Sequence, residues 1–499
     1  MIALSELSEK FGARIIGDGS VKVQGIVSDS RMIKGGELFA ACKGAISDGT
    51  LFAKDAERLG AAAVITDKEI EGLTVPQVIV DDITSRLGPV SSFVYGEPSA
   101  ELKLTSVTGT NGKTTVAYLS EAIFKAAGFS SGFIGTINYR FCGTEREASH
   151  TTPVADVLQG MLSEMVECGT EYCVMEVSSH ALDQRRVDGS LFDVKVFTNL
   201  TPEHLDYHKD MSRYFESKVR LFTDKSLSKR RSISVVNIDG EYGVKLADII
   251  GNKGHQGVVT YSLSNDANIF PESWDVTLDG IEAVVDTPGG HLSIKSALIG
   301  EHNLHNILAA IGVGLSYGLD IEDIEKGINE LKCVPGRLES VSNDKGINAF
   351  VDYAHTPDAL ERTLKVLKEL DCGRLITVFG CGGDRDKEKR PVMGASAARL
   401  SDVAIVTSDN PRGEEPGSII DDVVKGIVDV LPFDMEEPGK GGYITELDRE
   451  KAIEVAVSIA QAGDTLLIAG KGHEDYQIIG AEKTSFDDRV VLGNFLRDK

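Results

Sequence analysis

The glycine-rich segment SVTGTNGKTTVAYL at residues 106–119 constrains the fold of this chain more than any other stretch. The apolar run at residues 102–108 predicts a strand, and apolar residues at helical spacing predict a helix from Lys113 to a stop near Gly128. Backbone N–H groups at such a strand-to-helix turn favour an anion, as does the helix N-terminus. The segment therefore predicts a loop that holds the phosphates of a nucleotide.

The loop is shorter than the usual G-x-x-x-x-G-K-[ST] pattern, because Val107 stands where that pattern needs glycine. We expect Lys113 to meet the β- and γ-phosphates of ATP, and Thr114 or Thr115 to lend a hydroxyl to Mg²⁺. The alternative is an ordinary glycine turn with a surface lysine. The residues predicted to hold ATP here are Gly109, Thr110, Asn111, Gly112, Lys113, Thr114 and Thr115.

Length and charge narrow the class of protein. A chain of 499 residues exceeds what one hydrophobic core organises, so we expect about three domains. The formal net charge of -25 argues against a nucleic-acid partner, because phosphate backbones are bound by a surplus of Lys and Arg. We find no basic leader and no long apolar run, so we expect no signal peptide, no membrane span and a cytoplasmic location.

The cysteines predict neither a disulfide framework nor a zinc module. There are seven, an odd number in a long chain, and none forms a C-x-x-C pair. We expect reduced thiols in the core.

The order of predicted strands and helices divides the chain into three α/β parts. Residues 1–100 predict a small α/β domain, and residues 101–334 predict a doubly wound sheet with the phosphate loop after its first strand. Residues 335–499 alternate strands and helices, which predicts a second, Rossmann-like parallel sheet with right-handed crossovers.

Two strand ends in the middle part carry possible metal ligands. Glu176 ends the strand before VSSH, and His204 follows the next strand in TNLTPEHLDYH. Ligands are needed at strand ends beside a phosphate loop, so both are candidates for Mg²⁺, although the histidines could equally be solvated or capping residues. Lys218 lies in a predicted helix at residues 212–222, where the pattern alone favours a surface lysine.

Polar loops follow the strands of the last part. Arg385 in GGDRD and Arg412 in DNPR stand near the acids Asp409 and Glu474. Guanidinium groups bind carboxylates in pairs of hydrogen bonds, and a carboxylate holds an ammonium group, so the set suits an amino acid or a diamino acid. Two structural salt bridges are an equally good interpretation of the same residues.

The motifs TGTNGKTT, EVSSH, TNLTPEHLDYH, GEHNLHNILAA, PGRLE, DYAHTP and DNPR occur in this order, and with them the chain resembles the Mur ligases of bacterial cell-wall synthesis over its whole length. It is most similar to the members that add the third residue to UDP-N-acetylmuramoyl-L-alanyl-D-glutamate. The family has a UDP-binding domain, a central ATPase domain and a C-terminal domain for the incoming amino acid.

The resemblance implies roles for individual residues. For the UDP-muramoyl dipeptide these are Ser28, Ser30, Ala45, Ile46, Ser47, Thr151, Thr152, Ser178, Gln184 and Arg186. Around ATP they are Asn303, Asn306, Arg337, Asp352 and His355, and the metal ligands are Thr115, Glu176, His204 and Lys218, the last as a carbamate formed with CO₂. For meso-diaminopimelate they are Arg385, Asp409, Asn410, Pro411, Arg412, Gly470 and Glu474.

The reaction that the resemblance implies is ATP-dependent amide formation. ATP phosphorylates the D-glutamate γ-carboxylate, and the amine of meso-diaminopimelate attacks the acyl phosphate. Lys113, Lys218, His204 and His355 are the expected catalytic residues. We expect a monomer that uses ATP, two Mg²⁺ ions and the lysine carbamate. The alternatives are a lysine-adding ligase, a folylpolyglutamate synthetase-like ligase, or a P-loop NTPase that switches partner binding.

Overall fold

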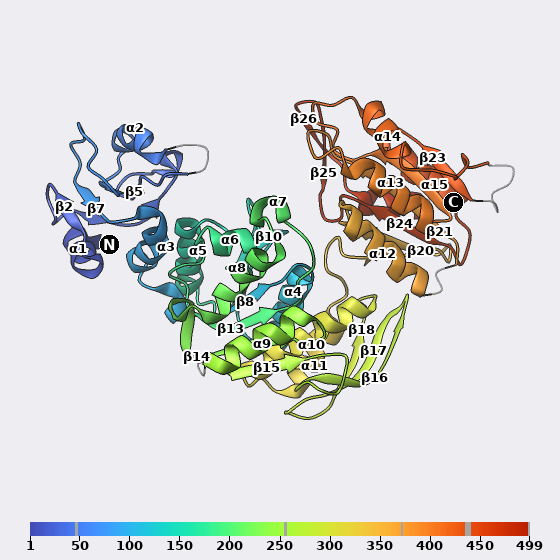
Figure 1. Cartoon of the computed structure of the whole chain (residues 1–499), viewed down its shortest axis with the longest axis horizontal. Coiled ribbons are helices and arrows are strands. Elements are labelled where there is room, and N and C mark those ends of the chain that lie inside the picture. The colour runs from blue at the N-terminus through green and yellow to red at the C-terminus, as the bar shows by residue number, and fades with distance from the viewer. Residues whose placement is uncertain (45–47, 254–256, 371–372, 435–440, 498–499) are drawn as a thin grey trace. The chain divides into compact units, whose positions relative to one another are not determined.

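The computed structural model of the chain describes residues 1–44, 48–253, 257–370, 373–434 and 441–497. It separates into two compact units, which we describe one at a time. The first contains residues 1–272, 284–293 and 305–328, and the second contains residues 273–283, 294–304 and 329–499. Both are built from parallel sheets with helices between the strands, which confirms the predicted α/β class (Figure 1).

The first unit begins with a five-stranded sheet in the order β2-β7-β6-β5-β4. Strands β4 to β7 are parallel, and β2 pairs with β7 in the antiparallel sense. The elements of this part are β1 (Ile2–Ala3), α1 (Leu4–Phe11), β2 (Arg14–Ile16), β3 (Lys22–Val23), β4 (Ile26–Val27), η1 (Ser30–Met32), β5 (Leu38–Ala40), η2 (Gly49–Phe52), α2 (Ala53–Arg58), β6 (Ala63–Thr66), β7 (Gln77–Ile79), α3 (Ile83–Val94) and η3 (Pro98–Ala100).

The same unit continues into an eight-stranded sheet in the order β11-β10-β9-β12-β8-β13-β14-β15, whose strands β9, β12, β8, β13, β14 and β15 are parallel. Its elements are β8 (Lys103–Thr108), α4 (Lys113–Ala126), β9 (Ser131–Ile134), β10 (Asn138–Phe141), β11 (Thr144–Glu147), α5 (Ala155–Glu167), β12 (Tyr172–Glu176), α6 (Ser179–Asp183), β13 (Phe192–Phe197), α7 (Leu205–His208), α8 (Met211–Thr223), η4 (Lys225–Leu227), β14 (Ser228–Asn237), α9 (Glu241–Lys253) and β15 (Gly257–Tyr261).

The register of this sheet sets the position of the phosphate loop. Thr108, the last residue of β8, pairs with Phe197 at the end of β13, and Val107 pairs with Glu176 at the end of β12. The predicted strand and helix are confirmed as β8 and α4, which lie side by side with β13 in Figure 1. The carboxyl ends of three neighbouring strands therefore meet at the glycine turn.

A three-stranded sheet follows, in the order β16-β17-β18. Its strands and the two helices after it are β16 (Phe270–Thr277), β17 (Gly280–Asp286), β18 (Leu292–Ser296), α10 (Glu301–Ser316) and α11 (Ile321–Glu330).

The second unit is organised around a six-stranded sheet in the order β19-β20-β24-β21-β22-β23. All of its pairs are parallel except that of β19 with β20. Its elements are β19 (Glu339–Ser340), β20 (Asn348–Asp352), α12 (Pro357–Glu369), β21 (Leu375–Cys381), α13 (Lys389–Leu400), β22 (Val403–Ser408), α14 (Pro416–Val424), β23 (Gly442–Thr445), α15 (Arg449–Ile459), β24 (Thr465–Ala469), β25 (Tyr476–Ile479), β26 (Glu482–Ser485) and α16 (Asp488–Arg497).

Side chains that alternate along these strands build two cores, one on each face of the sheet. In β21, Leu375 and Phe379 pack in a cluster with residues of α12, α13 and α14. Ile376 and Val378 pack in another cluster, with residues of α15 and α16. Successive side chains of a strand point to opposite faces, so a continuously apolar strand requires cover on both sides. This pattern makes the sheet doubly wound.

One expectation about the cysteines is wrong. Cys142, in the turn between β10 and β11, forms a disulfide with Cys168 at the end of α5. The two lie 26 residues apart in the sequence, and only the packing of the hairpin against the helix brings them together. Cys173 and Cys381 are buried free thiols, as expected.

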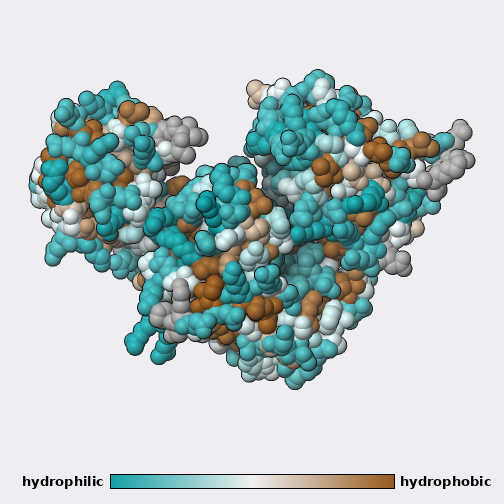
Figure 2. Space-filling view, in the orientation of Figure 1, coloured by the Kyte–Doolittle hydropathy of each residue, from teal (hydrophilic) through white to brown (hydrophobic). Residues whose placement is uncertain are grey.

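The surface agrees with the composition. Hydrophilic residues cover most of the face seen in the space-filling view (Figure 2), in agreement with a charged-residue content of 26%. No helix among the described residues is long and apolar enough to cross a membrane.

Candidate active site

The phosphate loop is held in shape by the neighbouring strand end. The backbone N–H of Thr110 donates to the carbonyl of Asn199 (2.9 Å), and that of Asn111 donates to the Asn199 side chain (2.9 Å). The Lys113 ammonium group donates to the carbonyls of Gly109 (3.0 Å) and Thr110 (2.8 Å), so it lies folded over the loop. Asn199, which our sequence prediction missed, follows β13 and fixes the loop together with Thr198, whose hydroxyl donates to the carbonyl of Asn111 (2.6 Å).

The two loop glycines are required by conformation and by space. Gly109 has φ +148° and Gly112, the N-cap of α4, has φ +85°. A Cβ atom would lie 1.9 Å from the Thr198 hydroxyl at the first position, and 2.3 Å from the Asn306 side chain at the second. Asn306, a predicted ATP residue, therefore lies directly against the loop.

Glu176 lies at the centre of a group of hydroxyl side chains. It is fully buried, and it accepts hydrogen bonds from the Thr114 hydroxyl (3.1 Å) and from the backbone N–H (2.9 Å) and hydroxyl (3.0 Å) of Thr136. Thr115 is buried in the same first turn of α4. A buried carboxylate among hydroxyl groups, at the edge of a phosphate loop, is a donor set of the kind that Mg²⁺ prefers.

Lys218 is buried, so the surface position that its helix pattern favours is wrong. Only 1% of it is exposed, and its ammonium group donates to the carbonyl of Gly109 (3.0 Å) and lies 4.8 Å from the centre of the Tyr214 ring. Burial, and then the nearby Lys113 cation, lower the pKa of Lys218 well below its ordinary value. The lysine thus lies against the phosphate loop, where burial destabilises its charged form.

The two histidines of the H-x-x-x-H segment differ. His204 is the left-handed N-cap residue of α7 (φ +56°), with 43% of its side chain exposed. Burial lowers the pKa of His204, and the nearby Lys113 and Lys218 add to that shift against the opposing effect of Glu203. His208 is buried and bonds to the Ser179 hydroxyl (3.0 Å), which gives it a structural role.

The residues predicted to contact the muramoyl dipeptide form one network. The carbonyl of Thr152 accepts from Arg186 (3.0 Å), which also donates to Gln184 through two nitrogens (3.0 and 2.7 Å). The Thr152 hydroxyl donates to the carbonyl of Glu176 (2.9 Å) and accepts from the backbone N–H of Ser178 (3.1 Å). Thr151 reaches the same network through the hydroxyl of Thr136 (3.1 Å).

A cavity of about 810 Å³ lies at the small N-terminal sheet. Ser28 and Ser30 line it, together with Asp29, Arg31, Phe39, Cys42, Gly44, Gly49, Phe52, Asp55, Arg58 and Leu59. The predicted uridine contacts Ala45, Ile46 and Ser47 lie outside the described residues. The lining combines aromatic and aliphatic surface, which suits a base, with two arginines that pair with the lining acids Asp29 and Asp55.

In the second unit, the predicted ATP residues gather where β20 ends. Asp352 is buried, and its carboxylate accepts from the backbone N–H groups of Leu338 (2.8 Å) and Ala354 (2.9 Å). Burial raises the pKa of Asp352. The guanidinium of Arg337 lies 5.3 Å from the centre of the Tyr353 ring, and the imidazole of His355 lies 4.5 Å from it. Asn303 is also buried and donates to the carbonyl of Ile299 (2.8 Å).

The loops after β21, β22 and β24 bring the predicted amino-acid residues together. Asp409 and Asn410 are buried, Asn410 donates to the Glu474 carboxylate (3.1 Å), and burial raises the pKa of Glu474. Lys471, which our prediction missed, is fully buried; it donates to the Asn410 side chain (3.1 Å) and lies 3.4 Å from the Asp409 carboxylate. Gly470, with φ +120°, begins this last loop.

The two predicted specificity arginines do not form salt bridges with carboxylates among the described residues. Arg412 has φ +50° and donates to the carbonyls of Gly383 (3.0 Å) and Asn410 (3.4 Å). Arg385 is exposed and donates weakly to the carbonyl of Asp384 (3.4 Å). The interpretation as two structural salt bridges therefore fails among the described residues, and ligand binding by these arginines stays a prediction. Pro411 links Asn410 to Arg412 and is buried.

The carboxylate of Glu414 joins the loop that carries Arg385 to the loop that carries Arg412. Glu414 accepts from the backbone N–H of Asp384 (2.7 Å), from Lys387 (3.0 Å), and from two nitrogens of the fully buried Arg390 (2.9 and 3.1 Å). The loop with Arg385 and the loop with Arg412 are thereby fixed to each other. Glu414 and Arg390 were not predicted, since nothing in their local sequence indicates this pairing.

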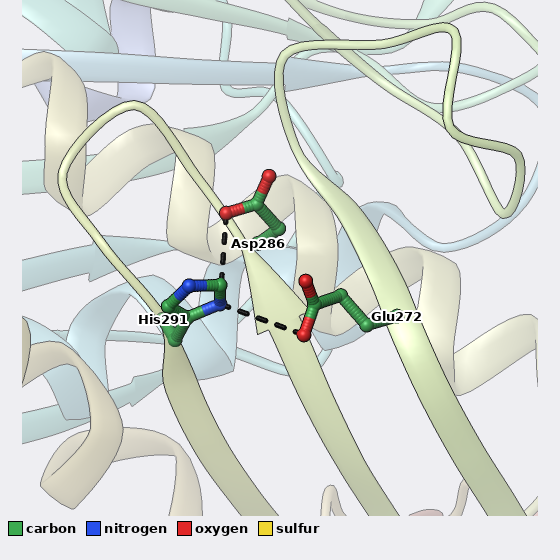
Figure 3. Close-up of side chains that lie close together, drawn as sticks. All are labelled: Glu272, Asp286 and His291. Atoms are coloured by element: carbon green, nitrogen blue, oxygen red, sulfur yellow. Dashed lines mark ion pairs between the residues drawn. The ribbon is translucent and has the colours of Figure 1, made fainter.

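One cluster lies away from these sites. Figure 3 shows His291 between Glu272 and Asp286, at the end of the three-stranded sheet. Its Nδ1 atom lies 3.6 Å from a carboxylate oxygen of each acid. All three side chains are partly exposed to solvent, and their mutual ion pairing accounts for the arrangement.

A phosphate loop, a buried acid and a buried lysine lie at the edge of a parallel sheet. These are the features of an α/β enzyme that binds a nucleotide through its phosphates. Comparison with known families is more specific. Residues 22–91 match the model described as "Mur ligase family, catalytic domain", residues 107–314 match "Mur ligase middle domain", and residues 336–472 match "Mur ligase, glutamate ligase domain". The chain belongs to the Mur ligase family and is an amide-bond-forming ligase.

Two individual relatives match the chain over nearly its whole length. A protein of Geobacter sulfurreducens named UDP-N-acetylmuramoyl-L-alanyl-D-glutamate--2,6-diaminopimelate ligase is 46% identical over 483 residues, which cover 95% of this chain and 94% of the relative. A protein of Gloeobacter violaceus with the same name is 44% identical over 97% of this chain and 96% of the relative.

Solved structures show the same architecture. One described as a UDP-N-acetylmuramoyl-L-alanyl-D-glutamate--2,6-diaminopimelate ligase has a TM-score of 0.73 at 32% identity, covering 99% of this chain and 98% of that one. A folylpolyglutamate synthase of Mycobacterium tuberculosis, complexed with ADP, has a TM-score of 0.60 at 18% identity, covering 78% of this chain and 91% of that one. The second likeness is one of fold alone.

Proposed function

We propose that the protein joins meso-diaminopimelate to the D-glutamate γ-carboxyl of UDP-N-acetylmuramoyl-L-alanyl-D-glutamate, with cleavage of ATP to ADP and phosphate. The observation that carries the proposal is the 46% identity, over 95% of the chain, to a relative named for this reaction. The site geometry supports it, because a phosphate loop, a cavity with an aromatic side chain, and arginines with no carboxylate partner among the described residues match the chemistry of the three substrates.

The chemistry needs ATP because a carboxylate is a poor electrophile. Transfer of the γ-phosphoryl group to the carboxylate gives an acyl phosphate, in which phosphate is a good leaving group. The amine then attacks the carbonyl carbon, and the tetrahedral intermediate expels phosphate. Lys113, folded over the loop carbonyls, would turn toward the β- and γ-phosphates and offset their charge during transfer.

The residues around Glu176 fit Mg²⁺. Glu176, Thr115 and His204 would hold it, and a bound ion would neutralise phosphate charge in the transition state. A second ion fits only if Lys218 is modified, because an ammonium group repels a cation. CO₂ reacts with a neutral amine to form a carbamate and release a proton, and the lowered pKa of the buried Lys218 supplies that amine. We therefore propose Lys218 as a carbamate ligand.

We assign the second unit to the incoming amino acid and to part of the ATP site. Arg412 and Arg385 would bind the distal carboxylate of diaminopimelate, which lysine lacks. Asp409, Asn410 and Glu474 would hold an ammonium group. His355, Arg337 and Asp352 would contact ATP. The three-part division at residues 1–100, 101–334 and 335–499 stays a prediction, as do the monomeric state and the cytoplasmic location.

The deciding experiment supplies the protein with ATP, Mg²⁺, UDP-N-acetylmuramoyl-L-alanyl-D-glutamate and either meso-diaminopimelate or lysine. We expect phosphate release that depends on both co-substrates, and a product heavier by one diaminopimelate residue in mass spectrometry. Equal use of lysine would favour a lysine-adding ligase. Phosphate release that ignores the UDP-linked acceptor would favour an NTPase switch and refute the proposal.

A further inference from the structure

We propose that Asp156 is a positioning residue that sets the nucleotide cavity against the central sheet, so that the UDP-linked substrate can reach both. This inference rests on the function proposed above for the cavity and for Thr152. Asp156 lies in the first turn of α5, outside every site described so far, and only 4% of it is exposed.

The first observation is a contact between the two sheets of the first unit. The backbone N–H of Ser28, which lines the cavity, donates to Oδ2 of Asp156 (2.7 Å). Ser28 follows β4 of the small sheet, whereas α5 belongs to the eight-stranded sheet and packs against both α3 and β4. Asp156 therefore joins the cavity loop to the central part of the unit through one hydrogen bond.

The second observation is that the other carboxylate oxygen is left without a hydrogen bond. Oδ1 of Asp156 is buried and has no partner among the described residues. A buried carboxylate with an unsatisfied oxygen is costly, and such groups in native structures need an explanation. The start of α5 offsets part of that cost, because a helix N-terminus stabilises negative charge. One hydrogen bond, from Ser28, does not satisfy this carboxylate, so we infer that the residue serves to hold the cavity loop in position.

The third observation is the path from Asp156 to the phosphate loop. Thr152 lies four residues before Asp156, and its hydroxyl donates to the carbonyl of Glu176 (2.9 Å). The side chain of Glu176 accepts in turn from Thr114 in the first turn of α4 (3.1 Å). A short segment thus connects the cavity at one end to the phosphate loop at the other, and a substrate that spans both would depend on that spacing.

The charge of Asp156 argues against direct contact with the nucleotide. Cys42 lines the cavity, and burial, followed by the negative charge of Asp156, raises the pKa of its thiol to about 12. A negative charge felt at the cavity would repel a diphosphate. What matters at Asp156 is then the oxygen atom that accepts the hydrogen bond. Asparagine supplies such an oxygen without the charge.

The test compares Asp156→Ala and Asp156→Val, which have no side-chain acceptor for the Ser28 N–H, with Asp156→Asn, which has one. Loss of this bond should raise KM for the UDP-muramoyl dipeptide about tenfold, with kcat within about threefold and KM for ATP and diaminopimelate unchanged. Asp156→Asn should restore KM to within about threefold of the original. Having two truncating variants keeps the test open if one of them fails to fold.

Asp193 provides a matched control. It also accepts a backbone N–H in the first unit, that of Leu104 (2.8 Å), but both residues lie on strands of the eight-stranded sheet. Asp193→Ala should lower the melting temperature without changing KM for the UDP-linked substrate. The proposal is overturned if the truncating Asp156 variants keep the original KM, if all three KM values rise together, or if Asp156→Asn is as impaired as Asp156→Ala.

Calorimetry with UDP separates this inference from the proposed function. If the unmodified enzyme binds UDP but makes no tripeptide product, the proposed reaction fails, and weaker UDP binding by Asp156→Ala still supports the positioning role. If the enzyme makes product and Asp156→Ala binds UDP as tightly as before with unchanged KM, the reaction stands and the positioning role fails.

Discussion

The carboxyl edges of the eight-stranded and six-stranded sheets are built alike but carry different cations. At the first edge the charged groups are Lys113 and Lys218, both bonded to loop carbonyls beside glycine. At the second edge the cations include Arg385 and Arg412, which bond to carbonyls and not to carboxylates among the described residues, whereas the buried Lys471 there is paired with Asp409. In parallel sheets, ligands bind at the carboxyl ends of the strands, so both edges are suited to ligand binding. The two edges differ in the side chains that they carry.

The difference follows from what each cation can do. A lysine is a compact charge whose pKa falls on burial, so it can follow a moving phosphoryl group or react with CO₂ as a neutral amine. An arginine stays charged and presents a rigid fork that matches a carboxylate. The first edge therefore suits chemistry on phosphate, and the second suits recognition of an amino acid.

The largest effect is expected at Lys218. Lys218→Ala should lower kcat by about 10³-fold, and short carboxylic acids should restore part of the activity by standing in for the carbamate. Lys218→Arg should be equally impaired, because it keeps the cation but cannot form a carbamate. Steady-state phosphate release measures both, and Lys125→Ala, an exposed lysine on α4, is the control. Full activity in either Lys218 variant would remove this residue from the chemistry and erase the contrast between the two edges.

A smaller effect, confined to one substrate, is expected at Arg412. Arg412→Ala should lower kcat/KM for meso-diaminopimelate by about 10²-fold, because one charged hydrogen-bonding partner is lost, and should leave KM for ATP unchanged. Arg412→Lys should fall in between, since it keeps the charge without the fork. Arg399, an exposed arginine on α13 that pairs with Glu361, provides the control. Equal loss with ATP and with diaminopimelate would mean that the second edge does not recognise the amino acid separately.

The glycine turn should respond more modestly. Gly112→Ala places a Cβ atom against Asn306 at positive φ, so KM for ATP should rise about tenfold and the melting temperature should fall. Gly128→Ala is the matched control, because Gly128 also has positive φ (+83°) but has no atom within 4 Å of the added group. It should lower stability alone. If both substitutions changed KM for ATP alike, strain at the helix end, and not space at the loop, would explain the effect.

The smallest effect is a pH dependence of stability in the second unit. Hydrogen bonds from Arg390, and then from Lys387, hold the pKa of Glu414 at about 2, below its ordinary 4.5. Because the folded-state pKa is depressed, this stabilisation is present above pH 4.5 and is lost as the pH falls toward 2. The melting-temperature difference between the original protein and Glu414→Gln should therefore shrink between pH 7 and pH 3. A constant difference over that range would mean that the carboxylate charge does not hold the arginine loops.

Much of the first edge could be predicted from local sequence. The spacing around Gly109 and Gly112 requires a turn between a strand and a helix, and Glu176 was expected at the end of the neighbouring strand. What failed there depended on distant packing: Lys218 is buried although its helix pattern favours the surface, and Asn199 fixes the loop from another strand. Helical periodicity shows which face of a helix is apolar. It cannot show that a polar side chain such as that of Lys218 is buried against the phosphate loop.

At the second edge the sequence named the arginines but left their role open. Arg385 and Arg412 have no carboxylate partner among the described residues, because the acid in their loops, Glu414, pairs instead with the buried Arg390. Lys471 and the disulfide between Cys142 and Cys168 are further examples of partners brought together from separate segments. Each of these residues has many possible partners in the sequence, and the spacing along the chain does not show which pair forms.

By itself, the sequence determined the α/β class, the phosphate turn and the family, because these follow from short-range periodicity, glycine conformation and ordered motifs. The tertiary structure alone decided which charges are buried, which acids meet which cations and which backbone groups a side chain reaches. Those outcomes depend on desolvation and on contacts between residues far apart in the chain, and both exist only once the sheets have packed.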